Sequence, residues 1–311
     1  KIGDSLKIRL PNQYVVRSGA TLSAQDTTET SVTLQVATQK GVDLNFTSTD
    51  LTMSLDDFSK RIIEPAMSVL AANIEYDAMT MYKDVYQSVW NGGSAVTLAK
   101  VLAGRKILQD ALAPLNARTA NLNTQDNVDL VDSLKGLFND TTNISKQYRE
   151  GYMGRTAGFD FMENTMWPAH TRGGSNGAYL TNGATQSGST LVVDTGATAP
   201  AAGDVITIAG VFKVHPETKV STGILQQFVV GAGATTTSFP ISPAIVATGA
   251  TQNVSNTAAD NSAVTFLGTA STAVGTSLLY QEGAFAFATA DLVMPDGVDW
   301  KAREVFDGIS M

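Results

Sequence analysis

The strongest pattern in the sequence is a long run of helically spaced apolar residues between Ser54 and Trp90. Steps of three and four place these residues on one face of an α-helix. A continuous helix over this stretch is about 55 Å long at 1.5 Å per residue. A helix of that length is a spine along which other parts of the chain must lie. Its apolar positions are Leu55, Phe58, Ile62, Ala66, Val69, Leu70, Ile74, Ala78, Met81, Val85 and Val89.

The ends and the continuity of this helix depend on a few residues. Ser54 with Asp57 three residues later forms a capping-box pattern, and acidic residues suit the positive end of the helix dipole. Pro65 lacks a backbone donor, so it predicts either a kink or two helices in line. In both cases the apolar face continues beyond the proline.

A two-stranded hairpin is predicted before the helix. Residues 2–17 alternate, with Leu6, Ile8 and Leu10 on one face and Lys7 and Arg9 on the other. Alternation returns over residues 32–36 and 42–46. Such a hairpin is marginally stable alone in water, so it must pack either on its own domain or on a neighbouring subunit.

The rest of the chain divides by composition. Helices are predicted over residues 94–114, with Ser94 as the cap, and 127–138, followed by a helical turn at 144–150 and a strand at 158–163. Between 173 and 275 short strand candidates alternate with Gly, Pro and Asn, which predicts an inserted all-β barrel or sandwich. Apolar strands are predicted again at 283–288 and 290–294. The only charged residues of the insertion are Asp194, Asp204, Lys213, Glu217, Lys219 and Asp260.

Composition excludes several function classes. The 311 residues include 21 basic and 29 acidic side chains, and a net charge of −8 does not suit a general nucleic-acid binder. The chain has no cysteine, and no apolar run reaches the roughly 20 residues of a membrane span. Lys1 in place of an initiator Met, and an unfinished pattern from Trp300 to Met311, are typical of a trimmed chain.

Candidate chemistry is sparse, and the sequence predicts no catalytic residue, cofactor or metal site. His170 and His215 have no second histidine at ligand spacing, so a structural or surface role is favoured for each. Gly173 to Gly177 matches G-x-S-x-G around Ser175, but the flanking sequence lacks the strand and the helix of a nucleophile elbow. A flexible junction explains these glycines better, and a serine hydrolase using Ser175 is kept as a rival hypothesis.

Several segments together resemble a known family. The resemblance is strong over residues 50–172, concerns architecture over 2–49 and 173–275, and extends again over 278–311. The segments that carry this resemblance are Ile63 to Met67, Leu70 to Ile74, Leu130 to Phe138, Gln147 to Arg155, Ala157 to Phe161, Glu163-Asn164 and Pro168 to Thr171. In these segments the chain resembles the major coat protein of short-tailed phages of the P-twenty-two type.

This resemblance implies an α+β fold of the Hong Kong 97 capsid type with an inserted all-β Greek-key barrel. Residues 1–49 would form the extended E-loop hairpin and 50–91 the peripheral domain with the spine helix. Residues 92–172 would form the first part of the axial domain, 173–275 the inserted barrel, and 276–311 a return to the axial and peripheral domains. The family's N-terminal arm and last C-terminal strands are missing from this sequence.

The resemblance also implies a function. Copies of the chain would form hexamers and pentamers of an icosahedral shell, assembled in the host bacterial cytoplasm with a scaffolding protein and a portal protein. The shell would enclose double-stranded DNA without sequence-specific binding, and the protein would belong to the virion. The alternative is a nanocompartment shell of the same fold that encloses protein cargo.

The intersubunit contacts are expected in the hairpin, at Lys7, Arg9, Arg17 and Glu29. These charges are placed to meet partners across a subunit seam. The opposing interpretation, that they are merely solvated, stays open at this point.

Overall fold

The computed structural model describes residues 5–27, 29–36, 38–45, 59–134, 153–175, 178–289, 297, 305–306 and 309–310. The chain divides into two compact units. The first comprises Lys1–Ala71 with Gly283–Met311, and the second comprises Ala72–Glu282. The domain boundaries expected from the sequence are finer than this division and stay predictions.

The first unit contains the predicted hairpin. Strands β1 (Ser5–Arg9) and β2 (Ser31–Gln35) pair antiparallel, with Leu6 opposite Leu34 and Ile8 opposite Val32. The hairpin prediction is therefore confirmed, with shorter strands than the alternation indicated. Residues 38–45 form no strand, so the extension predicted over 42–46 is wrong as far as residue 45.

The predicted long helix is present but ends early. A π-helical turn (Ser59–Ile63), helix α3 (Glu64–Met79) and a 3-10 turn (Thr80–Asp84) follow one another without a break. The proline ring would clash with the carbonyl four residues earlier, and the wider π-helical turn before Pro65 relieves that clash. The proposed capping residues 54–57 lie outside the described residues.

The early end of this helix has a tertiary cause. Val85 is extended, with ψ 113°, so the helix does not continue to Trp90. The side chain of Gln227 accepts a hydrogen bond from the Ser88 amide at 2.9 Å and donates one to the Ser88 carbonyl at 3.0 Å. These bonds anchor Ser88 to Gln227, and residues 85–90 form no helix despite their helical spacing.

The second unit contains a small mixed sheet with two helices. Its strand order is β14-β3-β5-β4, and only β3 and β5 are parallel. The predicted strand at 158–163 is confirmed, whereas α4 begins after Thr97 rather than after Ser94. Residues 135–152, which include the predicted turn at 144–150, lie outside the described residues. The elements are β3 (Arg118–Leu122), β4 (Arg155–Thr156), β5 (Phe159–Glu163), β14 (Leu278–Gln281), α4 (Leu98–Asp110) and α5 (Thr124–Leu134).

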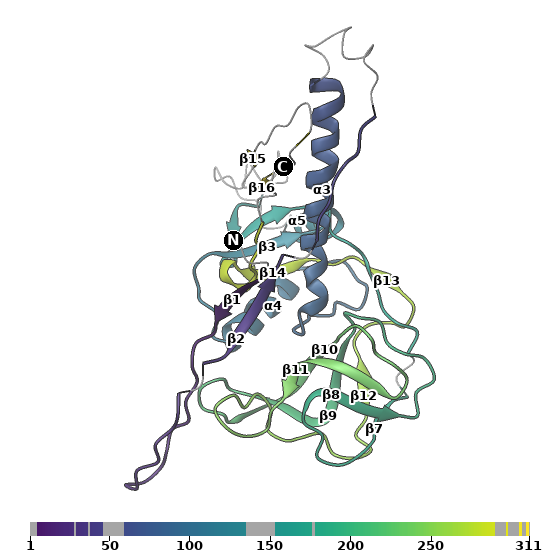
Figure 1. Ribbon diagram of the computed structural model, residues 1–311. Helices are drawn as coiled ribbons and strands as arrows, with labels where there is room; N and C mark the ends of the chain where they lie inside the picture. Colours follow the sequence, from purple (N-terminus) through teal and green to yellow (C-terminus); the bar gives the residue numbers. More distant parts are fainter. Residues whose placement is uncertain are drawn as a thin grey trace. The chain divides into compact units, whose positions relative to one another are not determined.

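The predicted β-rich insertion is a six-stranded antiparallel sheet in the same unit (Figure 1). Its strand order is β12-β9-β10-β11-β8-β7. The Thr181 amide donates to the Ser262 carbonyl and the Val264 amide to the Tyr179 carbonyl, both at 3.0 Å, so β7 returns to β12 and the sheet is nearly closed. The strands are β7 (Leu180–Thr181), β8 (Gly188–Asp194), β9 (Val205–Val214), β10 (Ser221–Val230), β11 (Ser238–Ile245) and β12 (Val264–Phe266).

The barrel encloses its own apolar core, with Ile206, Phe228 and Phe239 fully buried. The chain leaves for the barrel along β6 (His170–Thr171) and returns along β13 (Ala273–Val274), which pair antiparallel. The apolar stretch at 283–288 forms a 3-10 turn and irregular chain, so the strand predicted there is wrong. The strand predicted at 290–294 lies outside the described residues.

Candidate assembly surface and barrel junction

The hairpin carries all four residues expected at intersubunit contacts. Arg9 and Glu29 lie together, with 3.1 Å between Nη1 and Oε2. Arg17 donates a local hydrogen bond to the Gly19 carbonyl, and Lys7 lies opposite Thr33. The structure thus pairs two of the four charges with each other, on exposed side chains, and leaves their role between subunits a prediction.

The opposite face of the hairpin is apolar and uncovered. Cross-strand partners share a face, so Leu6, Ile8, Val32 and Leu34 form one apolar stripe. Leu6 is 60% exposed and Val32 is 54% exposed. A two-stranded ribbon cannot bury such a stripe by itself, and an exposed apolar patch marks an interaction surface.

The ribbon extends beyond its regular strands as a narrow arm (Figure 1). The Leu10 amide donates to the Thr30 carbonyl at 2.9 Å. Further out, Gln25 accepts a hydrogen bond from the Val15 amide at 2.9 Å and donates to the Val15 carbonyl at 2.6 Å. These side-chain bonds keep the two chain segments together where backbone pairing has stopped.

A buried polar network fastens the start of the barrel. Asp204 is 1% exposed and accepts hydrogen bonds from the Ala201 amide at 2.9 Å and the Gly173 amide at 3.1 Å. Nε2 of His170 lies 3.0 Å from Asp204 Oδ1, and Nδ1 of the same ring lies 3.0 Å from the Tyr82 hydroxyl. The network joins the end of the long helix, β6 and the beginning of β9.

The Tyr82 hydroxyl is held protonated. Burial, reinforced by the charges of Tyr76 and Asp204, raises the pKa of Tyr82 to about 12. The two ring nitrogens of His170 thus bridge the Tyr82 hydroxyl and the Asp204 carboxylate. His170 is therefore a structural residue bonded on both sides, as its isolation in the sequence indicated.

Ser175 does not have the surroundings of a nucleophile. Its side chain is fully buried, and Oγ lies 3.5 Å from Nη2 of Arg172. Arg172 also donates to the Gly268 carbonyl at 2.9 Å and to the Ser175 carbonyl at 2.5 Å. A guanidinium cannot act as the general base that a hydrolase needs, so the contacts described for Ser175 give the serine hydrolase hypothesis no support.

Close packing explains a glycine of the G-x-S-x-G match. A Cβ on Gly173 would lie 2.5 Å from the Ala201 amide nitrogen and 2.9 Å from Asp204 Oδ2. The G-x-S-x-G match therefore begins where the backbone packs closely at the start of the barrel. The network itself was missed from the sequence, where the one signal was Asp204, a charge in a nearly uncharged insertion.

The described residues contain neither a cluster suited to a metal ion nor a helix suited to a bilayer. Within the described ranges, no three His, Cys, Asp or Glu side chains are grouped so that they could hold a metal ion. No helix among the described residues is long and apolar enough to span a bilayer.

Comparison with known proteins gives only distant similarity. No protein-family model matches the sequence, and no curated protein matches it. A chain of Mycobacterium phage Che8 is similar at 20% identity and a TM-score of 0.43, over 53% of this chain and 63% of that chain. A chain from the capsid structure of the cyanophage P-SCSP1u is similar at 14% identity and a TM-score of 0.43, over 57% of this chain and 63% of that chain.

A third similarity concerns a single domain. The CUS-3 coat protein I-domain is similar at 29% identity and a TM-score of 0.25, over 30% of this chain and 98% of that domain. The chain spans less than two thirds of the Che8 and P-SCSP1u chains. At these TM-scores, all below 0.5, the similarities do not establish a shared fold.

Proposed function

We propose that this chain is the major capsid protein of a short-tailed phage of the P-twenty-two type. Its copies form hexamers and pentamers of an icosahedral shell around double-stranded DNA, with the help of scaffolding and portal proteins. Assembly takes place in the bacterial cytoplasm, and the product is the virion shell. The fold is of the Hong Kong 97 type with a Greek-key barrel inserted.

The uncovered apolar stripe of the ribbon carries this proposal. Leu6 and Val32 are more than half exposed, so folding alone does not remove them from water. In a shell, the ribbon of one copy lies on the adjacent copy, and burial of the stripe contributes roughly 25 cal/mol per Å² of apolar surface. Arg9 and Glu29 on the hairpin, with Lys7 and Arg17, then border the seam.

Three other observations support the same assignment. The sequence resemblance covers the long helix and the segments that flank the mixed sheet. In the barrel, β8 pairs with β11, whereas β9, β10 and β11 follow one another, and this order supports a Greek key. An acidic subunit also fits a shell that encloses DNA without binding it specifically.

Negative-stain electron microscopy of the full-length protein, alone and with its scaffolding protein, tests the proposal. The parent should give closed shells of uniform size. A Leu6→Ser, Val32→Ser double variant should stay unassembled with an unchanged far-ultraviolet circular dichroism spectrum. Thr33→Ser, on the opposite face of the ribbon, is the matched control and should assemble.

The outcomes separate the parts of the proposal. Only monomers of the parent under both conditions would contradict the capsid assignment. Normal shells from the double variant would contradict the role of the stripe and leave the capsid assignment in place. Protein cargo instead of DNA in shells from the native source would favour the nanocompartment.

A further inference from the structure

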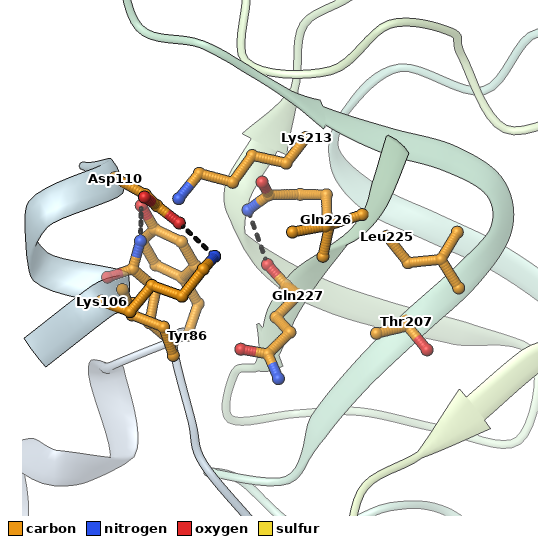
Figure 2. A pocket seen from close by; sticks show the side chains of 11 residues that line it. Tyr86, Lys106, Asp110, Thr207, Lys213, Leu225, Gln226 and Gln227 are labelled. Carbon is orange, nitrogen blue, oxygen red and sulfur yellow. Dashed lines mark hydrogen bonds and ion pairs between the residues drawn. The ribbon is translucent and has the colours of Figure 1, made fainter. Parts of the chain in front are cut away.

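A cavity of about 390 Å³ lies within the second unit, between α4 and the barrel (Figure 2). Its volume is in the range of small-ligand sites, about 300–1,000 Å³. The walls come from the extended segment after the long helix, from the second half of α4, and from β9 and β10. The lining includes Lys106, Ile107, Asp110, Lys213, Leu225, Gln226 and Gln227.

One end of the cavity has an excess of positive charge. Nζ of Lys106 is bonded to Oδ2 of Asp110 at 2.6 Å, so this carboxylate is already paired. Figure 2 shows the Lys213 amine directed toward the same two side chains. The side-chain amine of Lys213 has no hydrogen bond or ion pair among the described residues, whereas the backbone carbonyl of Lys213 accepts a bond from the Thr222 hydroxyl.

The position of Lys213 is unfavourable for a cation. Burial lowers its pKa, the Asp110 carboxylate opposes this effect and Lys106 reinforces it. One carboxylate lies near two ammonium groups and is paired with only one of them, which leaves a net charge of +1 at this end. An added anion would stabilise the ammonium form of Lys213.

The floor of the cavity offers a hydrogen-bond acceptor. Gln226 is 4% exposed, and its Nε2 donates to the Gln227 carbonyl at 2.8 Å. The amide oxygen of Gln226 has no partner in the part of the chain that the structure describes. The neighbouring Gln227 side chain is engaged by Ser88, so it forms a fixed wall.

These groups match the chemistry of a peptide better than that of a phosphate ester. The Gln226 oxygen can pair only with a donor, which a backbone N–H supplies and an ionised phosphodiester does not. The apolar side chains of Ile107 and Leu225 fit an aliphatic side chain beside the charged group. A single excess positive charge suits one carboxylate.

We propose that this cavity binds an acidic peptide segment of a partner protein. The segment's carboxylate lies at Lys213 and Lys106, and one of its backbone N–H groups donates to the Gln226 oxygen. The site does not depend on the capsid assignment, because every residue that forms it belongs to one unit of one chain.

Saturation-transfer difference NMR tests this, since the method works for single chains and for large assemblies. The probe is a blocked Leu-Glu dipeptide, and the neutral Leu-Gln dipeptide is its control. The parent should bind the acidic probe, and Lys213→Gln should weaken binding about ten-fold, the effect of losing one charge-assisted contact. Lys213→Arg keeps the positive charge and should keep binding.

A matched variant controls for net charge. Lys100→Gln makes the same charge change on α4, outside the cavity, and should bind as the parent does. Circular dichroism of each variant verifies the fold. The proposal is overturned by equal binding of both dipeptides, by equal weakening in Lys213→Gln and Lys100→Gln, or by no binding to the parent. Inorganic phosphate that displaces the dipeptide at equal concentration would identify a simple anion site and also overturn it.

Discussion

The ribbon and the barrel are built from the same kind of alternating strands, yet they bury them differently. In the barrel, β7 meets β12 and the inward side chains, such as Phe239 and Ile206, are fully buried. In the ribbon, two strands pair and Leu6 stays 60% exposed. Alternating strands therefore form a core only where the sheet closes on itself. The apolar face of an open two-stranded ribbon stays exposed unless another surface covers it.

The largest expected difference between the barrel and the ribbon is in the free energy of unfolding that is lost when an apolar side chain is removed. Phe239 packs edge-to-face on Tyr179, with ring centroids 4.9 Å apart, so Phe239→Ala should lower the free energy of unfolding by about 4 kcal/mol. Leu6→Ala should lower that of the unassembled protein by less than about 0.5 kcal/mol. Urea unfolding followed by circular dichroism measures both. Equal losses would show that the ribbon is buried within its own chain.

Much of this contrast could be predicted from the sequence, because strand alternation depends on neighbours in the chain. The hairpin, the all-β insertion and the existence of the long helix follow from local periods of two and of three to four. The end of the helix does not follow from them. Gln227, which fixes Ser88 in extended chain, lies 139 residues away, and no local pattern reports that contact.

The same limit applies to the candidate sites. Lys7 and Arg9 were predicted from the sequence because they alternate with the apolar stripe, whereas Arg17 and Glu29 lie outside that alternation. The pairing register brings Arg9 toward Glu29, and the role of all four between subunits stays a prediction. The barrel junction was missed because His170 meets Tyr82 and Asp204 from 88 and 34 residues away. A lone buried carboxylate in a nearly uncharged domain is a signal for such a network, but it does not identify the partners.

The next effect concerns polar groups, which are buried at the barrel junction and exposed on the ribbon. Asp204→Ala leaves the Gly173 and Ala201 amides and His170 without their acceptor, and should cost about 3 kcal/mol of unfolding free energy. Asp260→Ala, at an exposed carboxylate that accepts bonds from the Gly183 amide and the Asn261 side chain, is the control and should cost less than about 1 kcal/mol. Urea unfolding of both variants measures the difference. A loss at Asp204 no larger than that at Asp260 would mean that solvent reaches the junction.

Alkaline pH should weaken the junction in a defined interval. An unfolded tyrosine ionises near pH 10, whereas the pKa of Tyr82 is raised to about 12 in the folded chain. The folded state therefore holds the proton more tightly, and this contribution to stability is complete below pH 10 and is lost as pH rises toward 12. Tyr82→Phe should reduce the decline in stability over that interval and remove a phenolate transition near pH 12 from the ultraviolet titration. Persistence of that transition in Tyr82→Phe would assign it to another tyrosine.

The smallest effect is expected at the Arg9–Glu29 pair, where the ribbon is most unlike the junction. Both side chains are exposed, 77% and 59%, so water screens their attraction. A double-mutant cycle with Arg9→Ala and Glu29→Ala should give a coupling below about 1 kcal/mol in the unassembled protein. A coupling above about 2 kcal/mol would show that the pair is shielded from water, and it would remove the contrast with the junction.

If these charges meet partners across a subunit seam, Arg9→Ala should raise the protein concentration needed for assembly while it leaves the unassembled chain equally stable. Unchanged assembly would favour the interpretation that the charges are solvated.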